Sequence, residues 1–400
     1  MKIFKYGVIL FFLIMAVGCK KSEVLEKPKN DVPGDVVFNI VSEVPVHSVQ
    51  RLEDVITETN MDIVSENFLI NTTELGEIKY TVDYLYNEKK YSYKFTIAVT
   101  DKENPIIFGS TTQTSIIGKE YDLCSAINYG DNHDSDPKCE ITGNYDFNTL
   151  GEYKLKMNVT DSSGNATEKE VKLNIINPST SNGGSSSTTK RIEFSDVMAK
   201  YGDENTEFGI DISSWQENVG FTKVKEAGAT FVMIRLGFQK GINGELKIDS
   251  YYDQNIAGAK AAGLKVGVYL YTDAGSVKEA KEHALWMVEK LDKTKLDLPV
   301  VFDWENWSNF NKYRISFNDL NEIADTFLET IEENGYKAML YGSKYYLETF
   351  WKNKNNYPIW LAHYTEKTSY KEKYLMWQLC NTGKINGIAG PVDINIMYND

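Results

Sequence analysis

The chain has 400 residues, which is too long for one domain and predicts two or three. Its formal net charge of −14 and isoelectric point of about 5.0 argue against nucleic acid as a partner. The acidic residues are spread along the chain, which indicates a solvated surface rather than one charged patch.

The first residues have the features of an export signal. A short basic start, 1–5, precedes an apolar run, 6–17, that is too short to cross a bilayer comfortably. The following Ala-Val-Gly-Cys, 16–19, resembles the lipobox of bacterial lipoproteins, with alanine where leucine is usual. The resemblance implies a signal peptide at 1–18, a lipid on Cys19, and an exported protein anchored to the membrane and facing the cell wall. An ordinary secretory cleavage nearby is the alternative.

A charged tether at 19–34 precedes two predicted β units, at 35–102 and 103–176. The segment 71–80 is echoed by 148–155, and each is followed by two strands in which apolar and polar residues alternate. This repeat predicts small sandwiches in tandem. The L-G-x-Y…V-T-D-x-x-G-N series resembles the immunoglobulin-like modules of bacterial surface proteins. We expect these modules to act as spacers.

The second β unit contains two further candidate sites. Cys124 and Cys139 could form a disulfide in an exported chain, whereas Cys380 is expected to be a buried thiol. The acidic loop Asp131–Asp136 could bind calcium through oxygen atoms, but its ligand spacing matches no known motif and a solvated loop is favoured. The four histidines are scattered, so no metal site is predicted.

A Ser/Gly/Thr-rich linker, 177–195, separates the β units from a region of alternating strands and helices, 196–400. Such alternation predicts a parallel sheet. Strands are expected at 208–213, 230–236, 265–271, 300–306, 337–341, 359–364, 375–379 and 392–397. The connections after the fifth strand are short. We therefore predict an α/β TIM-like barrel whose last strands are abbreviated, of the (β/α)5(β)3 type.

Acidic residues recur at the ends of the predicted strands. Asp303 and Glu305 end the most apolar strand, on one face, while Asp211 closes the first strand and Asp393 lies in the eighth. Carboxyl ends of barrel strands open at one rim, so these four groups are expected to converge. Enzymes that hydrolyse glycosidic bonds use a pair of carboxyl groups, one of which is kept protonated.

Aromatic residues are predicted at the same rim and are candidates for stacking on the apolar faces of sugars, although many must also fill the barrel. These candidates are Trp215, Tyr269, Tyr271, Trp360 and Tyr364.

Five segments together resemble family 25 of the glycoside hydrolases, the Chalaropsis-type lysozymes. They are 208–216, 231–237, 300–306, 360–364 and 392–395, in the order of the family. The resemblance implies an N-acetylmuramidase that cleaves the β-1,4 bond between N-acetylmuramic acid and N-acetylglucosamine in peptidoglycan. The family's four acids carry over onto Asp211, Asp303, Glu305 and Asp393, with no metal or cofactor. His363 departs from the usual glutamine or arginine.

Glu305 is the expected general acid, because desolvation beside an apolar strand keeps a carboxyl group protonated. Asp303 would orient the substrate's 2-acetamido group so that it acts as an internal nucleophile. Asp211 and Asp393 would position water and set the charge of the pair. Inversion, with Asp211 or Asp393 as base, remains open. The alternative function is a catalytically inactive wall-binding lipoprotein, and a barrel acting on another glycan is a third hypothesis.

Overall fold

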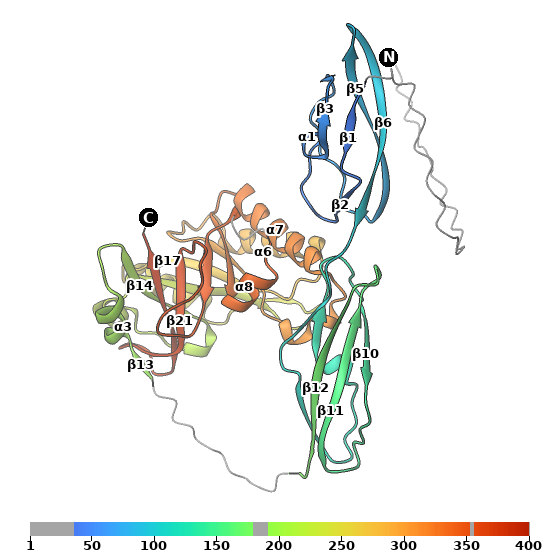
Figure 1. The fold of residues 1–400 in the computed structure, drawn as a ribbon. Helices are drawn as coiled ribbons and strands as arrows, with labels where there is room; N and C mark the ends of the chain where they lie inside the picture. Colours follow the sequence, from blue (N-terminus) through green and yellow to red (C-terminus); the bar gives the residue numbers. More distant parts are fainter. Residues whose placement is uncertain (1–35, 179–190, 353–355, 400) are drawn as a thin grey trace, which may run out of the picture. The chain divides into compact units, whose positions relative to one another are not determined.

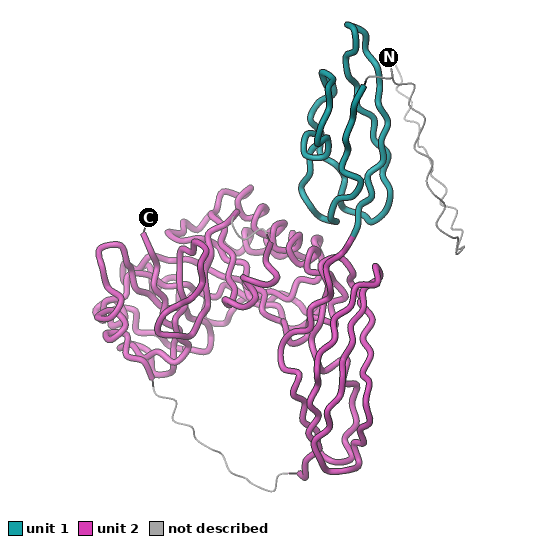
Figure 2. The backbone as a smooth tube through the Cα atoms, in the orientation of Figure 1, with its two compact units in different colours: residues 1–100 teal, residues 101–400 magenta. Residues whose placement is uncertain are grey.

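The computed structural model describes residues 36–178, 191–352 and 356–399. The predicted signal peptide, Cys19, the tether and most of the predicted linker lie outside these residues. No helix in the described ranges combines the length and the apolarity that crossing a membrane requires. The chain forms two compact units, residues 1–100 and 101–400, which Figure 2 distinguishes by colour.

The first unit consists of a four-stranded sheet in the order β2-β6-β5-β4 and a two-stranded sheet, β1-β3. The long hairpin of β5 and β6 buries alternate side chains, among them Val82, Tyr84 and Ile97, as the alternating sequence predicts. The immunoglobulin-like assignment stays a prediction. The elements are β1 (Phe38–Ile40), β2 (Glu43–Pro45), α1 (Leu52–Val55), β3 (Ile56–Thr59), β4 (Asp62–Ile63), β5 (Gly76–Tyr86) and β6 (Lys89–Thr100).

The second β module repeats this arrangement with a four-stranded sheet, β10-β11-β12-β8, and a two-stranded sheet, β7-β9. Cys124 and Cys139 are joined by a disulfide. The turn at 161–165 connects β11 to β12, as its composition predicts. The elements are β7 (Ile106–Phe108), β8 (Thr112–Ile116), α2 (Leu123–Ala126), β9 (Asn128–Gly130), β10 (Lys138–Thr142), β11 (Gly151–Thr160) and β12 (Ala166–Ile176).

The C-terminal part is a closed barrel of eight strands. The order β21-β20-β19-β18-β17-β15-β14-β22 returns to its start because β21 also pairs with β22. The barrel strands are β14 (Thr206–Ile212), β15 (Phe231–Gln239), β17 (Lys265–Tyr271), β18 (Val300–Asp303), β19 (Ala338–Ser343), β20 (Ile359–Ala362), β21 (Met376–Lys384) and β22 (Val392–Tyr398).

Helices follow each of the first five barrel strands, and short connections link the last three (Figure 1). These helices are α4 (Phe221–Glu226), α5 (Tyr252–Ala261), α6 (Val277–Leu291), α7 (Phe317–Glu333) and α8 (Lys344–Thr349). The remaining elements are β13 (Ile192–Glu193), α3 (Phe194–Tyr201), β16 (Leu246–Ile248) and the 3₁₀ turns η1 (Ser214–Gln216) and η2 (Trp307–Lys312). Because β13 pairs with β21, structure associated with the barrel begins before residue 196.

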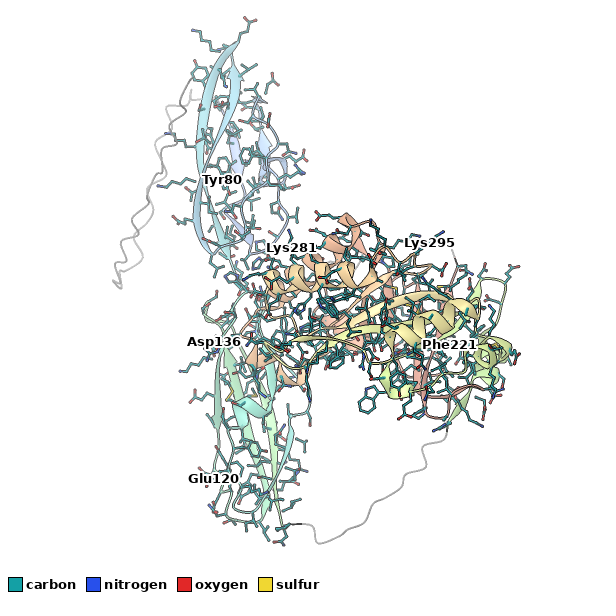
Figure 3. All side chains as sticks on the ribbon, turned by 180° about the vertical axis from the view of Figure 1, so that it is seen from behind. Tyr80, Glu120, Asp136, Phe221, Lys281 and Lys295 are labelled. Carbon is teal, nitrogen blue, oxygen red and sulfur yellow. A yellow bond between two sulfur atoms is a disulfide. The ribbon has the colours of Figure 1, made fainter. Side chains whose placement is uncertain are left out.

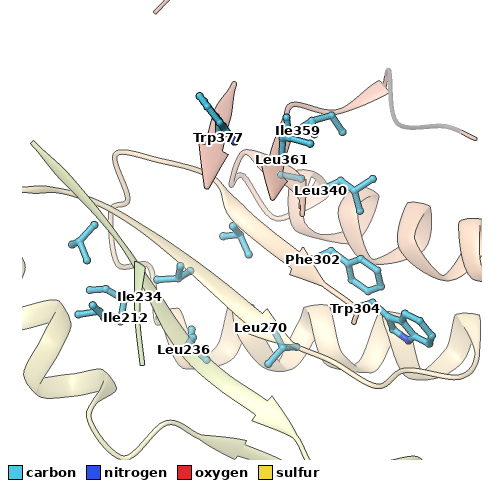
Figure 4. Close-up of a cluster of buried hydrophobic side chains, with 14 of the residues drawn as sticks. Ile212, Ile234, Leu236, Leu270, Phe302, Trp304, Leu340, Ile359, Leu361 and Trp377 are labelled. Atoms are coloured by element: carbon cyan, nitrogen blue, oxygen red, sulfur yellow. The ribbon is translucent and has the colours of Figure 1, made fainter. Parts of the chain in front are cut away.

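The strand residues divide into two buried layers by alternation. One set, including Met233, Val301 and Met339, packs inside the barrel. The other set faces the helices and joins the largest apolar core; Figure 4 shows Phe302 and Leu340 among its members. A strand of period two can fill both layers only if it is apolar on both faces, which explains the continuous apolar runs in this half of the sequence.

One detail of the predicted barrel is wrong. The eighth strand, β22, is antiparallel to both of its neighbours, β14 and β21. Asp393 therefore lies near the start of its strand and not at a carboxyl end. Because the strand runs in the opposite sense, its start reaches the same rim as the carboxyl end of β14, and Asp393 pairs with Asp211 in register.

The second β module packs directly onto the barrel within the unit of residues 101–400. Phe108 of β7 is 2% exposed and lies among Trp307, Phe310, Phe317 and Phe350, with ring centroids 4.9–6.3 Å away. The Asn311 side chain adds hydrogen bonds to the Tyr129 N–H and to the Ile127 carbonyl, at 3.0 and 2.8 Å. These contacts do not fit a module that acts only as a spacer.

Candidate active site

Asp303 and Glu305 lie where β18 ends at the mouth of the barrel. Alternation directs Val301 into the barrel, while Phe302 and Trp304 face the helices. The Trp304 indole N–H donates to the Ala274 carbonyl at 3.1 Å, which fixes the backbone between the two acids. Asp303 is 5% exposed, whereas Glu305 reaches solvent. The pair therefore extends from the interior to the rim.

Both members of this pair hold protons more tightly than ordinary carboxyl groups. Burial raises the pKa of Asp303 well above its usual range, and the Glu305 charge raises it further. Protein atoms around Glu305 desolvate its carboxyl and raise its pKa, although the hydrogen bond from Asp303 opposes this. The two groups share a hydrogen bond, so they titrate as a pair and retain a proton above the pH at which a free carboxyl loses it.

Asp211, near the end of β14, is a buried carboxyl group that two side-chain amides bind. Its Oδ2 accepts hydrogen bonds from Gln378 Nε2 at 3.0 Å and Asn395 Nδ2 at 2.7 Å. Burial raises the pKa of Asp211 to about 6, and the charge of Glu305 contributes, while the two amides oppose the rise. With this pKa, Asp211 is largely ionised at pH 7.

Asp393 faces Asp211 across the β14–β22 pair. Burial, followed by the Asp211 charge, raises its pKa to about 9. Two carboxyl groups held this close do not both ionise readily. Asp393 is therefore protonated at neutral pH while Asp211 is largely ionised.

Further side chains hold this arrangement. The Tyr341 and Tyr364 hydroxyls both donate to Gln378 Oε1 at 3.0 Å, which orients the Gln378 amide toward Asp211. The Trp360 indole N–H donates to Asn395 Oδ1 at 2.8 Å and orients the second amide in the same way. The positions of both donors to Asp211 are therefore fixed by a second set of hydrogen bonds.

A partly buried cation lies close to these acids. Arg235 on β15 donates to Asp249 at 2.8 Å and to the Ser214 hydroxyl at 2.9 Å. Its charge also lowers the pKa of Asp303, although burial and the neighbouring acids outweigh this effect. The arrangement thus contains four carboxyl groups of unequal acidity, which is what acid–base chemistry on a neutral substrate requires.

Comparison with known proteins shows which family this part of the chain is similar to. The family model for Glycosyl hydrolases family 25 matches residues 210–388. Over these residues, which are less than half of the chain, the protein is similar to the family 25 glycosyl hydrolases. Asp211, Asp303 and Glu305 lie within the match, and Asp393 lies just beyond it.

The matches to individual relatives cover about half of this chain. The uncharacterized protein YegX of Escherichia coli K12 is 29% identical over 192 residues, which are 47% of this chain and 68% of YegX. An autolytic lysozyme of Clostridium acetobutylicum is 31% identical over 189 residues, covering 47% of this chain and 54% of that protein. A solved family 25 glycosyl hydrolase from Bacillus anthracis aligns with a TM-score of 0.43 and 23% identity, covering 50% of this chain and 91% of that one.

The five aromatic residues predicted to bind substrate lie in different surroundings in the barrel. Trp215 is 83% exposed and Tyr364 is 53% exposed. Trp360 and Tyr269 are buried, and their rings meet edge-on with centroids 5.9 Å apart. Tyr271 is partly buried opposite Asp303 in register. Exposure favours sugar stacking for Trp215 and Tyr364, while Trp360 serves to orient Asn395.

Gln378, Asn395 and Tyr341 are site residues that the sequence argument did not single out. Gln378 and Asn395 are polar residues on the interior face of otherwise apolar strands, and both are at most 4% exposed. A buried amide in such a position needs a partner. A polar residue in an apolar strand could therefore have been predicted to bind another buried polar group. Which acid these amides bind depends on the register of β21 with β22.

Proposed function

We propose that the barrel is a family 25 peptidoglycan hydrolase that cleaves the β-1,4 bond between N-acetylmuramic acid and N-acetylglucosamine. The observation that carries the proposal is the convergence of Asp211, Asp303, Glu305 and Asp393 at one barrel mouth, with pKa values spread by burial. The autolytic lysozyme among the relatives supports this choice of substrate. The predicted anchor at Cys19 would place the enzyme at the cell envelope.

Glu305 is the proposed general acid. It is the member of the pair that reaches solvent, so its carboxyl can approach the glycosidic oxygen of a bound strand. Burial raises its pKa above the ordinary value, which favours the protonated form that a general acid needs. The proton passes from Glu305 to the leaving oxygen as the bond to the anomeric carbon breaks.

Asp303 is proposed to hold the 2-acetamido group of the cleaved sugar. As a carboxylate it accepts the acetamido N–H, which turns the acetamido oxygen toward the anomeric carbon. In the free protein the shared proton lies on Asp303, whose pKa is raised by burial and by the Glu305 charge and which donates to Glu305. The proposed roles therefore require that substrate binding transfer this proton from Asp303 to Glu305. The negative charge of Asp211 stabilises the positive charge that develops on the sugar ring, and Asp393 stays protonated beside it.

Trp215 and Tyr364 are proposed to bind the glycan strand on either side of the cleaved bond. Both belong to segments that follow barrel strands at the mouth, and both present exposed rings. Tyr364 also donates to Gln378, which links glycan contact to the amide that holds Asp211. Exposed rings of this kind stack on sugar faces.

The test compares the full chain with Glu305→Gln for release of reducing ends from purified peptidoglycan. We expect a loss of activity on the order of 10²–10⁴-fold, since glutamine keeps the shape and removes the proton. Binding to insoluble peptidoglycan should persist. Glu282→Gln, an exposed change on helix α6, is the matched control and should retain full activity.

Two outcomes of this comparison would contradict the proposal. If the full chain releases no reducing ends at any pH between 4 and 9 but sediments with peptidoglycan, the protein is a wall-binding lipoprotein. If Glu305→Gln is as active as Glu282→Gln, the acid lies elsewhere in the chain.

A further inference from the structure

Three buried carboxyl groups meet in the second β module, away from the barrel mouth. Asp101, Asp131 and Asp161 each follow the last residue of a strand, β6, β9 and β11 respectively. One oxygen of each lies within 4.8 Å of the others. Their exposed fractions are 8%, 0% and 7%. Three acids gathered in so small a buried volume repel one another unless a cation or protons neutralise them.

Backbone hydrogen bonds fix where two of these carboxyl groups point. Asp131 Oδ1 accepts from the N–H groups of His133 and Asp134, at 2.9 and 2.8 Å. Asp161 accepts from the Asn165 N–H and Nδ2, each at 2.8 Å. The backbone therefore fixes the orientation of the Asp131 and Asp161 side chains toward each other, and their proximity does not depend on a freely chosen rotamer.

Two oxygen atoms at this cluster have no partner. Asp131 Oδ2 is fully buried and accepts no hydrogen bond. Asn132 is 5% exposed and its Oδ1 is also buried without a partner, while its Nδ2 donates to Asp101 Oδ1 at 3.1 Å. The Asn132 amide thus lies against the carboxyl cluster, and a half-turn about its last torsion would present its oxygen there. Buried acceptors without a donor are rare and need an explanation.

We propose that Asp101, Asp131, Asp161 and the side-chain oxygen of Asn132 bind a calcium ion. All four ligands are oxygen atoms of carboxylates or an amide, the set that calcium prefers over zinc and other transition metals. A cation of charge +2 offsets most of the repulsion between the three carboxylates. It also provides the partner that Asp131 Oδ2 and Asn132 Oδ1 lack.

The site adjoins the contact between the β module and the barrel. The carbonyls of Asp131 and Asn132 accept hydrogen bonds from the Phe317 and Asn318 N–H groups, at 2.8 and 3.2 Å, at the start of helix α7. Asp136, in the same loop, is labelled in Figure 3 where the module meets the barrel. A bound ion that orders residues 131–136 therefore stabilises the packing of the module against α7.

The experiment is a calcium titration of the full chain, stripped with EDTA and dialysed, by isothermal calorimetry. We expect one ion per chain, with a dissociation constant on the order of 10⁻⁴–10⁻³ M, the range of extracellular calcium modules. In thermal unfolding, 10 mM CaCl₂ should raise the midpoint by about 2–4 °C, whereas NaCl of equal ionic strength should not.

Asp131→Asn and Asp136→Asn remove the same charge from the same loop, and only the first lies in the cluster; Asp136 is exposed. Asp131→Asn should lose the heat of calcium binding and the thermal shift, and Asp136→Asn should retain both. If Asp131→Asn does not fold, Asp161→Asn is used in its place. Absence of binding at millimolar calcium, or an equal shift in NaCl or in both variants, would overturn the proposal.

Discussion

Asp211 illustrates how two opposing effects set the acidity of one side chain. Burial raises its pKa, and hydrogen bonds from Gln378 and Asn395 oppose the rise. The resulting pKa of Asp211, about 6, lies between the ordinary value for an aspartate and the pKa of about 9 for Asp393. The ionisation of Asp211 should therefore form the acidic limb of the pH–activity profile, because the proposed mechanism needs its negative charge.

Asn395→Ala should move that acidic limb to higher pH. The substitution removes a 2.7 Å hydrogen bond that stabilises the ionised form of Asp211, so the pKa rises. A charge-assisted bond of this kind corresponds to a shift on the order of one pH unit. The measurement is kcat/KM for peptidoglycan fragments between pH 4 and 9. A limb at the same pH in both proteins would show that Asp211 is not the group that titrates.

Sequence reasoning reached the four acids of the site but not the residues that tune them. Asp303 and Glu305 could be found because two acids after an apolar strand are unusual in themselves. Gln378 and Asn395 are single polar residues within strands, and only the pairing of β21, β22 and β14 brings both to Asp211. Local pattern contains no information on that pairing.

At the scale of elements, strand β22 determines the electrostatics of the mouth. Its antiparallel direction places Asp393 opposite Asp211. The negative charge of Asp211 then raises the pKa of Asp393, so that only one of the two carboxyl groups ionises readily. The eight strands themselves follow from apolar runs in the sequence. The direction of the last strand also had a signal in the sequence, because the connection between β21 and β22 is too short to contain a crossover helix and therefore favours an antiparallel pair.

This arrangement makes the stability of the protein depend on pH. The folded-state pKa of Asp393, about 9, lies above its ordinary value of 3.8, so between these values the folded chain binds more protons than the unfolded chain. The free energy of unfolding therefore falls as pH rises through this window. The stabilising contribution of protonated Asp393 to the free energy of unfolding is fully present below about pH 4 and is lost as the pH rises to about 9.

Asp393→Asn should remove that part of the pH dependence. Asparagine keeps the shape and cannot ionise, so the variant should be more stable than the wild type at pH 9, with a smaller difference at pH 5. Urea unfolding at both pH values measures the effect, with the exposed Asp253→Asn as control. Equal pH dependence in the wild type and Asp393→Asn would mean that Asp393 is not protonated in the folded protein.

At the scale of the molecule, the second β module and the barrel share a core. The linker composition at 177–195 predicted two separate domains, and the module was expected to be a spacer. The contact depends on Phe108, an ordinary apolar residue in a short strand. Its aromatic partners, from Trp307 to Phe350, are distant in the sequence. Composition marks the presence of a linker but not whether the domains it joins pack together.

Phe108→Ala should therefore destabilise the barrel as well as the module. Removing a buried phenylalanine costs about 3–5 kcal/mol when its cavity cannot collapse, and Phe108 is 2% exposed among aromatic rings. Near-ultraviolet circular dichroism reports the barrel tryptophans during urea unfolding. Tyr145→Ala, at 41% exposure in the same module, should leave the midpoint unchanged. A barrel midpoint that Phe108→Ala does not lower would restore the spacer interpretation.

The central claim is that the acids at the barrel mouth cut peptidoglycan on one side of N-acetylmuramic acid. Mass spectrometry of borohydride-reduced fragments, released from purified peptidoglycan by the full chain, tests it directly, because reduction marks the sugar that carried the new reducing end. We predict fragments that end in reduced N-acetylmuramic acid, absent when Glu305→Gln replaces the wild type. Fragments that end in reduced N-acetylglucosamine, or soluble fragments without a new reducing end, would contradict the proposed bond.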